Sequence, residues 1–560
     1  MTRQVRVLVA GIAMLAVGVT LAALVVSARI AAPPLSGASA EETAAPAPRF
    51  IEEAMAAGLR HAYDGELTFF VGGGVAILDC DANDRPDLYL AGGAEPAALF
   101  RNVSERGGRL AFEAVPSEIT DLDRVTGAYP LDVDADRIGD LVVLRQGENV
   151  LLRGNGDCGF ERANEAWGVD GGDAWTAAFS ATWEEGSAWP SLAFGNYLVL
   201  DDEGRSTATC DGNVLLRPLD SGGYAEPIAL EPGWCSLSML FSDWDRSGRR
   251  DLRVSNDRHY YRDGSEQLWR IETGADPVLW SEEEGWQALR IFGMGIASRD
   301  LTADGYPEVF LTSQGDNKLQ TLAGDPARPE YVDIALRRGA TAHRPYAGDT
   351  TMPSTAWHPE FADVNNDGFV DLFVTKGNVE AQTDFAMRDP SNLLIGQPAG
   401  TFVEGAEEAG IVSYERARGA GIADLNLDGL LDLVVVNRRE NVSLWRNLGA
   451  GEGDAAASMG HWLMVDPVQP GGNRNAVGAW VEVRAGERTW SVERTVGGGH
   501  VSGQLGAIHV GLGEAEQAEV RIIWPDGEAG EWQEVAADAI VTIDRESDEM
   551  QRRLPGEPPP

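Results

Sequence analysis

The chain has 560 residues, with 45 basic and 88 acidic side chains and a net charge of −43 at pH 7. So strong a negative charge excludes ordinary nucleic-acid binding, which depends on a basic face, and disfavours contact with anionic membrane surfaces. A sizeable part of the acidity lies in short clusters, whose carboxylates repel one another unless cations bind between them.

The N-terminal 30 residues carry an apolar run from Val7 to Val26, preceded by Arg3 and Arg6. About 20 apolar residues can cross a bilayer as one helix, and such a run is long for a signal peptide. We expect a hydrophobic helix at 1–30 that serves as a signal peptide or a single-pass membrane anchor. Basic residues before this helix place the rest of the chain outside. Residues 31–50, rich in Pro and Ala, predict a flexible linker.

Acidic loops follow, and the clearest is FADVNNDGFVDLFV at 361–374. Its first half resembles an EF-hand calcium loop, but the Glu at position 12 and the flanking helices are missing. The loop instead lies between two short apolar runs of β type. We therefore predict a calcium loop that closes a β-hairpin. The alternative is a polar hairpin turn, which also favours Asp, Asn and Gly.

Six loops share this register, with predicted metal ligands at positions 1, 3, 5 and 9. The ligands are Asp79, Asp81, Asn83 and Asp87; Asp132, Asp134, Asp136 and Asp140; Asp243, Asp245, Ser247 and Asp251; Asp300, Thr302, Asp304 and Glu308; Asp363, Asn365, Asp367 and Asp371; and Asp424, Asn426, Asp428 and Asp432. Hard oxygen ligands without nearby His or Cys favour calcium over magnesium.

We expect about six calcium sites of unequal strength. The strongest are at 363–371 and 424–432, which have the full pattern with Gly at position 6. Ser247 and Thr302 replace a carboxylate by a neutral ligand, so their loops should bind more weakly. Arg137 at position 6 of the second loop tolerates the expected positive φ poorly.

The loops recur every 53 to 63 residues, except for one interval about twice as long. In that interval TWEEGSAWPSLAFGNY (182–197) has Trp and small residues in place of carboxylates, and we interpret it as a seventh unit that has lost its metal site. Seven units of short strands, none able to bury its own apolar face, predict an all-β fold with a seven-bladed β-propeller over 51–449. Trp175, Trp183 and Trp189 in the seventh unit form either an aromatic recognition patch or, more simply, part of the core.

A different pattern begins after a Gly/Ala-rich linker at 450–460. Short strands broken by Gly turns predict a small β-domain over 461–545. Residues 546–560, charged and then Pro-rich, predict a disordered tail.

Four cysteines, Cys80, Cys158, Cys210 and Cys235, suit an oxidising compartment and permit three pairings. A bond between Cys210 and Cys235 would close an insertion in the fourth unit. Free buried thiols are the alternative.

Two stretches resemble known families. The acidic loops are similar to the FG-GAP/VCBS calcium-loop repeats of integrin α-subunit propellers, and GAWVEVRAG, GGGHVSGQ, IHVGLG and WPDG resemble the ASPIC/UnbV domain. Together they resemble the cartilage-acidic-protein-like architecture over roughly 51–545, although Gly503 interrupts the usual Ser-Gln pair of the C-terminal motif. The resemblance implies calcium binding and an adhesive or recognition role, and it implies no established reaction.

An enzyme is the competing interpretation. The sequence has no GxSxG elbow, HExxH motif or Walker loop. We expect ordinary roles for His343 and His358, which flank a long loop at one mouth of the propeller, and structural roles for His500 and His509. We therefore expect an exported recognition or adhesion module for an extracellular protein or glycan. The alternative is a secreted or membrane-anchored enzyme that acts on carbohydrate or another extracellular substrate in the channel, with convergent His and carboxylate groups at its mouth.

Overall fold

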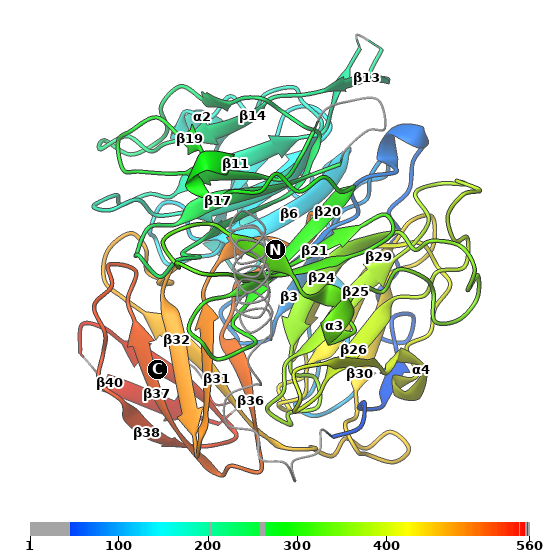
Figure 1. Cartoon of the computed structure of the whole chain (residues 1–560), viewed down its shortest axis with the longest axis vertical. Helices are drawn as coiled ribbons and strands as arrows, with labels where there is room; N and C mark the ends of the chain where they lie inside the picture. The colour runs from blue at the N-terminus through cyan, green and yellow to red at the C-terminus, as the bar shows by residue number, and fades with distance from the viewer. Residues whose placement is uncertain (1–44, 202, 258–263, 548, 555–556, 558–560) are drawn as a thin grey trace, which may run out of the picture.

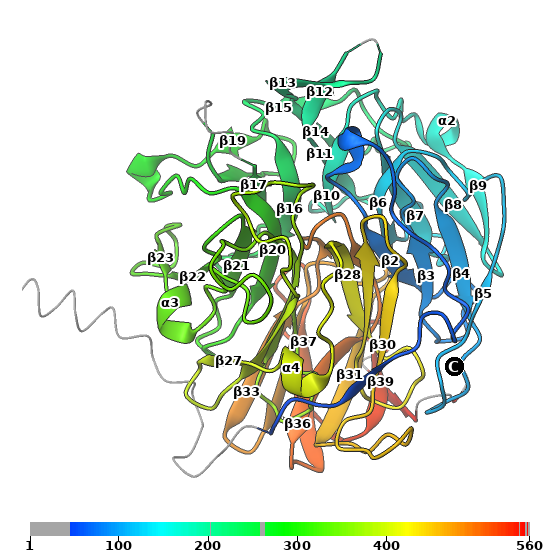
Figure 2. The ribbon, with the colours of Figure 1, turned by 90° about the vertical axis from the view of Figure 1, so that its right-hand side faces the viewer.

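The computed structural model describes residues 45–201, 203–257, 264–547, 549–554 and 557, and consists mainly of β-strands (Figures 1 and 2). The hydrophobic helix predicted at 1–30, and residues 31–44 of the predicted linker, lie outside this part of the chain. Among the described residues, no helix has the length and apolar character needed to cross a bilayer.

Seven antiparallel sheets, each with four strands of the repeat region, form a seven-bladed β-propeller. Within each blade the strands are ordered from the channel outwards. Blade 1 contains β2 (Val75–Leu78), β3 (Asp87–Leu90), β4 (Ala98–Asn102) and β5 (Phe112–Ala114); blade 2 contains β6 (Val125–Leu131), β7 (Asp140–Arg145), β8 (Val150–Gly156) and β9 (Gly159–Arg162); and blade 3 contains β10 (Thr176–Thr182), β11 (Ser191–Asn196), β14 (Asn213–Leu216) and β15 (Ile228–Leu230). Blade 4 contains β16 (Ser236–Ser242), β17 (Asp251–Asn256), β18 (Gln267–Arg270) and β19 (Val278–Leu279), and blade 5 contains β20 (Gly293–Arg299), β21 (Glu308–Ser313), β22 (Lys318–Leu322) and β23 (Tyr331–Asp333). Blade 6 contains β24 (Ala356–Ala362), β25 (Asp371–Lys376), β26 (Asn392–Gly396) and β27 (Phe402–Glu404), and blade 7 contains β28 (Ala417–Ala423), β29 (Asp432–Asn437), β30 (Ser443–Asn447) and β1 (Phe50–Glu52).

The blades form a closed ring. Their inner strands β2, β6, β10, β16, β20, β24 and β28 contact one another in this order, and β28 contacts β2 again. Strand β1, from the start of the described chain, completes blade 7 by pairing Phe50 with Asn447. Because the first and last strands of the propeller share one sheet, the ring cannot open without loss of a row of hydrogen bonds.

In the described part of the chain, the helices are short and lie in the connections. They are η1 (Leu67–Phe69), α2 (Asn164–Trp167), η2 (Glu282–Glu284), α3 (Ala335–Arg338) and α4 (Ala406–Ala409). Blade 3 carries an extra hairpin of β12 (Leu198–Leu200) and β13 (Ser206–Cys210). A disulfide between Cys210 and Cys235 ties this hairpin to the segment before β16. The insertion therefore belongs to the third unit rather than the fourth, because the chain returns to the third sheet at β14 after the hairpin.

The C-terminal domain consists of two four-stranded sheets that share one apolar core. One sheet contains β36 (Ile508–Gly513), β31 (His461–Val468), β39 (Ala539–Asp544) and β40 (Glu549–Arg553). The other contains β33 (Arg488–Glu493), β32 (Trp480–Ala485), β37 (Gln517–Ile523) and β38 (Gln533–Ala536). Strand β40 corrects the disordered tail that we predicted at 546–560. It pairs with β39, and Met550 packs against the core.

A segment of the C-terminal domain enters the propeller channel. Strand β34 (Val496–Gly497) pairs with β10 and β16, and β35 (Gly503–Gln504) pairs with β2. We call residues 496–503 the plug. A Cβ atom on Gly74 or Gly127 of the inner strands would lie 1.8 or 2.1 Å from the carbonyl oxygen of Val501. The glycine-rich approach to the first two loops therefore leaves room for the plug backbone.

Candidate metal centres

Each of the six acidic loops joins the inner strand of its blade to the second strand, so all six lie at the same end of the propeller. We call this end the acidic face. The C-terminal domain sits on it: Trp490 Nε1 donates to the carbonyl of Gly368 at 3.0 Å, and the amide of Asp243 donates to Glu493 at 2.8 Å. The C-terminal domain thus contacts the acidic loops of the propeller directly.

The six loops share one backbone conformation. Positions 4 and 6 have positive φ in every loop, between 54° and 65° at position 4 and between 67° and 89° at position 6. These residues are Ala82, Ala135, Arg246, Ala303, Asn366 and Leu427 at position 4, and Asp84, Arg137, Gly248, Gly305, Gly368 and Gly429 at position 6. Arg137 adopts this conformation despite its side chain, at a cost of about 1–2 kcal/mol. Position 4 could not be predicted from the sequence, because its residues share no feature that indicates positive φ.

Within a loop, backbone amides orient the carboxylates at positions 1 and 9. In the loop at 363, the Gly368 amide donates to Asp363 at 2.8 Å. Asp371 accepts one bond from the Val364 amide at 2.9 Å and another from the Gly396 amide at 2.8 Å. The position-9 carboxylate therefore fastens the loop to the third strand of its blade. The loops at 79, 132 and 424 repeat this pattern.

Asparagines at the end of the third strand of a blade connect neighbouring blades. Asn102 Nδ2 in blade 1 donates to the carbonyl of Leu425 in the loop of blade 7 at 2.7 Å. Asn447 Nδ2 in blade 7 likewise donates to Val364 in the loop of blade 6 at 2.8 Å. A change in one acidic loop therefore reaches the next blade through the carbonyl at position 2.

Several loop oxygens are buried without a hydrogen-bond partner. They are Asp81 Oδ1, Asp132 Oδ1, Asp134 Oδ1, Asp300 Oδ1 and Asn426 Oδ1. In the loop at 79, carboxylate oxygens at positions 1, 3 and 9 lie within 4.8 Å of one another, and in the loop at 132 those at positions 1, 3 and 5 do so. Buried oxygens without partners are costly, whereas calcium accepts six to eight oxygen ligands. The donor sets thus fit calcium.

Burial raises the pKa of the loop carboxyls, and the charges of neighbouring carboxylates raise it further. The pKa of Asp140 rises to about 8 and those of Asp87 and Asp424 to about 7. The pKa values of Asp371 and Asp432 lie well above the usual range for the same reasons. Without a cation the ionised loops oppose folding, so a bound cation would act as a folding partner.

The pH dependence of the cation-free protein follows from these pKa values. The unfolded aspartates are ionised by about pH 5, while folded Asp140 and Asp87 hold their protons up to pH 7 or 8. Because the folded state binds more protons, its stability falls as pH rises from about 4, the ordinary pKa of an aspartate, to about 8. In EDTA we expect a falling melting temperature across this range, and in saturating calcium a flat or rising one. A decline of equal size in both buffers would contradict the prediction.

Arginines already supply positive charge to some loops. Arg153 Nε lies 2.6 Å from Asp134 Oδ2, and its Nη2 lies 2.8 Å from Asp136 Oδ2. At the loop at 243, Asp251 accepts from Arg249 at 2.8 Å and from the indoles of Trp244 and Trp280 at 3.0 and 2.9 Å. Since these partners compete with a metal for the carboxylates, we expect weaker cation binding at both loops than at 363 and 424.

The seventh unit lies in blade 3 and has an ion pair in place of a ligand set. Trp183 occupies position 1 and is buried, and Glu184 accepts from Arg217 Nε and from the hydroxyl of Ser191 at position 9, both at 2.7 Å. Trp175 is buried as well, and Trp189 packs edge-on against Trp167. These tryptophans belong to the core of blade 3.

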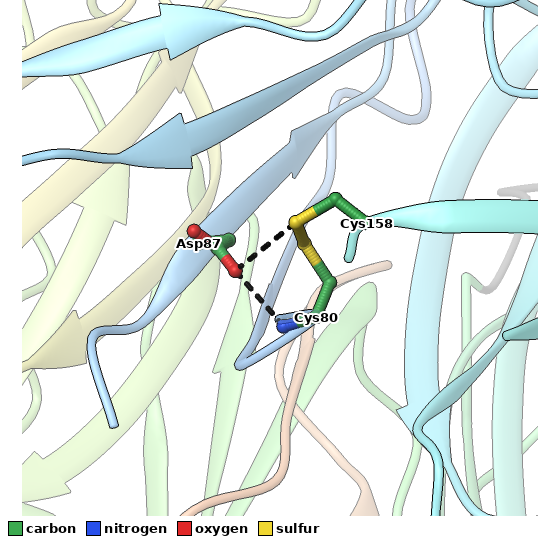
Figure 3. A group of neighbouring side chains, drawn as sticks. All are labelled: Cys80, Asp87 and Cys158. Carbon is green, nitrogen blue, oxygen red and sulfur yellow. Dashed lines mark hydrogen bonds between the residues drawn. A yellow bond between two sulfur atoms is a disulfide. The ribbon is translucent and has the colours of Figure 1, made fainter. Parts of the chain in front are cut away.

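A disulfide joins the first loop to the next blade (Figure 3). Cys80 at position 2 is bonded to Cys158 in the turn between β8 and β9, and the Cys80 amide donates to Asp87 at 2.9 Å. Both sulfurs are thereby excluded as thiolate ligands, although they lie beside Asp87. The covalent bond connects blade 1 to blade 2 at the acidic face.

Loss of this disulfide should destabilise the propeller. For the double variant Cys80→Ser with Cys158→Ser, we expect the free energy of unfolding to fall by about 2–4 kcal/mol, because the bond closes a long loop. Denaturant unfolding in calcium would measure the change. Equal stability of variant and parent would show that the bond does not constrain the unfolded chain.

Histidines in the channel hold the plug. The amide of His500 donates to His358 Nδ1 at 3.0 Å, and His500 Nδ1 lies 3.1 Å from the carbonyl of Met294. His358 Nε2 lies 3.3 Å from Glu360. Burial lowers the pKa of His500 to about 3, and the charge of Arg418 contributes in the same direction. Both histidines thus have structural partners in the channel, whereas His343 lies at an exposed ion pair with Asp316.

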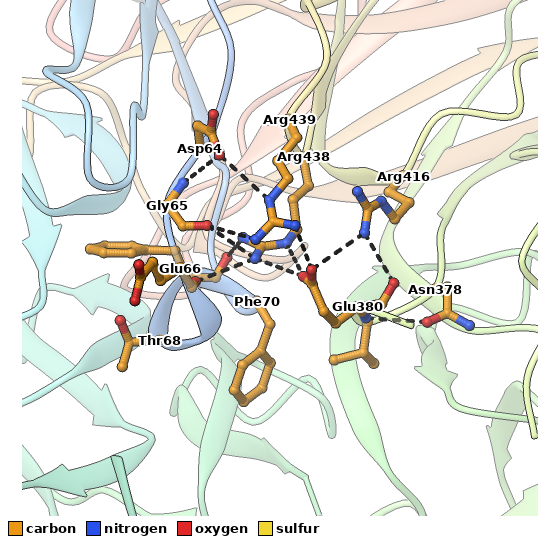
Figure 4. A network of polar contacts seen from close by, with 12 residues as sticks. Asp64, Gly65, Glu66, Thr68, Phe70, Asn378, Glu380, Arg416, Arg438 and Arg439 are labelled. Atoms are coloured by element: carbon orange, nitrogen blue, oxygen red, sulfur yellow. Dashed lines mark hydrogen bonds and ion pairs between the residues drawn. The ribbon is translucent and has the colours of Figure 1, made fainter. Parts of the chain in front are cut away.

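An ion-pair network lies at the end of the propeller opposite the acidic face (Figure 4). Glu380, in the loop after β25, lies 2.7 Å from Arg438 and 2.6 Å from Arg439. Arg416 is 3.8 Å away. Arg438 is fully buried and Glu380 partly so. The network therefore ties the loop after β25 in blade 6 to the loop after β29 in blade 7.

One sizeable cavity, of about 580 Å³, lies between the acidic face and the C-terminal domain. Its walls include Arg299, His358, Glu360, Glu493 and His509. The pKa of Glu493 is raised to about 8 by burial and by the charge of Asp243, and burial lowers that of His509 to about 3. This cavity could not be predicted from the sequence, because its walls come from distant parts of the chain.

Family comparisons agree with the two parts of the architecture. Residues 469–550 match the model described as ASPIC and UnbV, and residues 300–374, from the loop of blade 5 into blade 6, match an FG-GAP-like repeat. The chain carries an FG-GAP-like repeat and an ASPIC and UnbV domain. The strand topology extends the repeat architecture to seven blades. Comparison with curated proteins gave no match.

Solved structures with some similarity have low identity. An Agrocybe aegerita lectin that recognises non-reducing terminal N-acetylglucosamine has 14% identity and a TM-score of 0.37, over 65% of this chain and 88% of its own. PorZ, a surface component of the type-IX secretion system of Porphyromonas gingivalis, has 12% identity and a TM-score of 0.39, over 82% of this chain and 58% of its own. BBS1N, solved in complex with ARL6DN, has 10% identity and a TM-score of 0.41, over 72% of this chain and 96% of its own.

Proposed function

We propose that this protein is an exported, calcium-binding propeller that recognises an extracellular protein or glycan. The cartilage-acidic-protein-like architecture is part of this proposal. The observation that carries it is one backbone conformation in all six loops, with converging carboxylates in the loops at 79 and 132 and buried ligand oxygens without partners in the loops at 79, 132, 300 and 424. A polar turn needs none of these buried oxygens, whereas a calcium ion would use them as ligands.

In the calcium-bound protein, the chain's own residues would do three things. The side-chain oxygens at positions 1, 3, 5 and 9, including the hydroxyls of Ser247 and Thr302, would bind the ion in each loop. The position-9 carboxylates accept hydrogen bonds from the third strand of their blade, and asparagines such as Asn102, at the end of a third strand, donate to the loop of the neighbouring blade. Calcium would supply the positive charge that the buried carboxylates need, and so stiffen the acidic face beneath the ASPIC and UnbV domain.

Recognition is favoured over catalysis by the state of the channel. A substrate channel needs an open mouth and free catalytic groups. Here the plug occupies part of the channel, His358 and His500 hold the plug, and the ion pairs of Glu380 lie at the far end of the propeller. The enzyme alternative retains one observation in its favour, the cavity lined by His358, Glu360 and Glu493.

Export is supported by the cysteines. All four form disulfides, Cys80 with Cys158 and Cys210 with Cys235. Disulfides persist in oxidising compartments such as the periplasm or the cell exterior. Millimolar calcium, as found outside cells, is also the concentration at which extracellular-type sites bind.

Two measurements on one preparation would test the function. Calorimetric titration of EDTA-stripped protein should show several calcium sites that magnesium does not fill, and glycan-array binding should appear in calcium and vanish in EDTA. Calcium binding without any glycan signal would direct the search to protein ligands. Absence of calcium binding would contradict the proposal. Turnover of an arrayed glycan, abolished by Glu360→Gln, would favour the enzyme alternative.

A further inference from the structure

A fully buried lysine stands out in this chain. Of the 45 basic residues only Lys318 and Lys376 are lysines, and the other 43 are arginines. Lys376 ends β25, and its side chain and that of Asp389 are both 0% exposed, with Nζ 3.0 Å from Oδ1. Lys318 forms an ordinary, partly exposed pair with Asp333 at 3.2 Å. The buried position thus has a primary amine in a protein that otherwise uses guanidinium groups.

The contact between Lys376 and Asp389 is close and fully buried. Lys376 Nζ lies 3.0 Å from Asp389 Oδ1, and no hydrogen bond to another group of the described residues satisfies the amine. The carboxylate itself is fixed: Oδ1 accepts from the hydroxyl of Ser354 at 3.0 Å and Oδ2 from the amide of Thr355 at 2.8 Å. These donors hold the carboxyl in place and withdraw electron density from its carbon. The amine is left facing a polarised carboxyl.

A second, partly buried acid acts on the same amine. Glu404 ends β27 in the same blade, accepts from the amide of Ala406 at 2.9 Å, and interacts electrostatically with Lys376. Burial lowers the pKa of Lys376 and raises those of Asp389 and Glu404. Burial therefore favours a neutral amine and neutral carboxylic acids, which are the forms that can condense.

We propose that Lys376 and Asp389 become joined by an intramolecular amide bond. The lone pair of Nζ attacks Cγ of Asp389, one Cγ–Oδ bond breaks, and the departing oxygen leaves as water. Its two protons come from the amine and from the carboxylic acid, and Glu404 relays the amine proton to the leaving oxygen. The reaction consumes one amine and one acid, yields one amide and one water, and needs no oxidant or cofactor.

The bond would remove an unfavourable feature of the fold. An ion pair without exposure suffers a large desolvation penalty, and an amide does not carry that charge. Arginine could not replace lysine in this role, since a guanidinium stays protonated and is no nucleophile here. The bond would also close the loop that carries Glu380, and so fix the ion-pair network at the end of the propeller opposite the acidic face (Figure 4).

Peptide mapping of the full protein gives a direct test. Trypsin does not cleave at an acylated lysine, and Pro345 protects the bond after Arg344. After denaturation, reduction and complete digestion, we expect residues 339–388 linked to 389–416, one water lighter than their sum. Cleavage at Lys318 in the same digest shows that digestion is complete. Separate peptides 339–376, 377–388 and 389–416 from folded protein would overturn the proposal.

Variants locate the bond and the proton relay. Lys376→Met and Asp389→Ala should each abolish the linked species, while Lys318→Met should leave it unchanged. Glu404→Gln should keep the fold and lower the yield of linked peptide at least tenfold. A linked species that survives Asp389→Ala would overturn the assignment to Asp389, and full yield in Glu404→Gln would overturn the relay. If the Lys376 and Asp389 variants do not fold, the mass of the parent peptides still decides whether the bond exists.

Discussion

Removal of calcium is expected to lower the melting temperature of this protein by on the order of 10 °C. At about 1 mM calcium, a site with a Kd near 0.1 mM contributes roughly 1.4 kcal/mol, and six such sites contribute roughly 8 kcal/mol. Part of this gain comes from relief of repulsion among buried carboxylates, whose pKa values are raised. Thermal unfolding in EDTA, in a calcium titration and in magnesium would measure the effect.

Single-site variants assign this effect to the loops. Asp367→Ala and Asp428→Ala should each reduce the calcium-dependent rise in melting temperature, since each removes a position-5 carboxylate from one of the two strongest sites. The seventh unit offers a matched control: Glu185 is an exposed acid at position 3 of a loop without a ligand set. Glu185→Ala should leave the rise intact. An undiminished rise in both Asp variants would refute our ligand assignment.

A side chain at Gly127 is expected to expel the plug from the channel. Its Cβ would lie 2.1 Å from the Val501 carbonyl oxygen and 2.6 Å from Val501 Cβ. Backbone cannot yield there without breaking the pairing of β34 and β35 with the inner strands. For Gly127→Val we expect a loss of about 3 kcal/mol or more in the free energy of unfolding, at the upper end of overpacking effects.

Limited proteolysis would separate plug release from a general loss of stability. In Gly127→Val, cleavage within residues 496–503 should become rapid, because the plug is buried in the parent. Gly139, in the acidic loop of the same blade, has no atom within 4 Å of an added Cβ. Gly139→Ala should therefore behave like the parent in both assays. Slow cleavage of the plug in the Gly127 variant would show that the channel accommodates the side chain.

The repeat and its loops could be predicted from the sequence because their signals are local. Ligand spacing, the apolar runs on either side and the recurrence of the unit depend on residues within about a dozen positions of one another. These local signals were enough to predict seven units, one of which has no ligand set. The same signals predicted that each acidic loop closes a β-hairpin, as the structure shows. Position 4 escaped prediction because residues as different as Ala82, Arg246 and Leu427 adopt the same positive φ there.

Only the tertiary structure decided how distant segments meet. The GGGHVSGQ stretch resembles a Gly turn in the sequence, yet it enters the channel, because its fit depends on Gly127 and Gly74, which lie 374 and 427 residues before Val501. The seat of the ASPIC and UnbV domain on the acidic face, the pairing of Cys80 with Cys158 and the burial of Lys376 beside Asp389 also arise from long-range packing. Spacing in a sequence specifies local backbone and ligand chemistry, whereas packing between blades and domains depends on surfaces that exist only after each unit has folded.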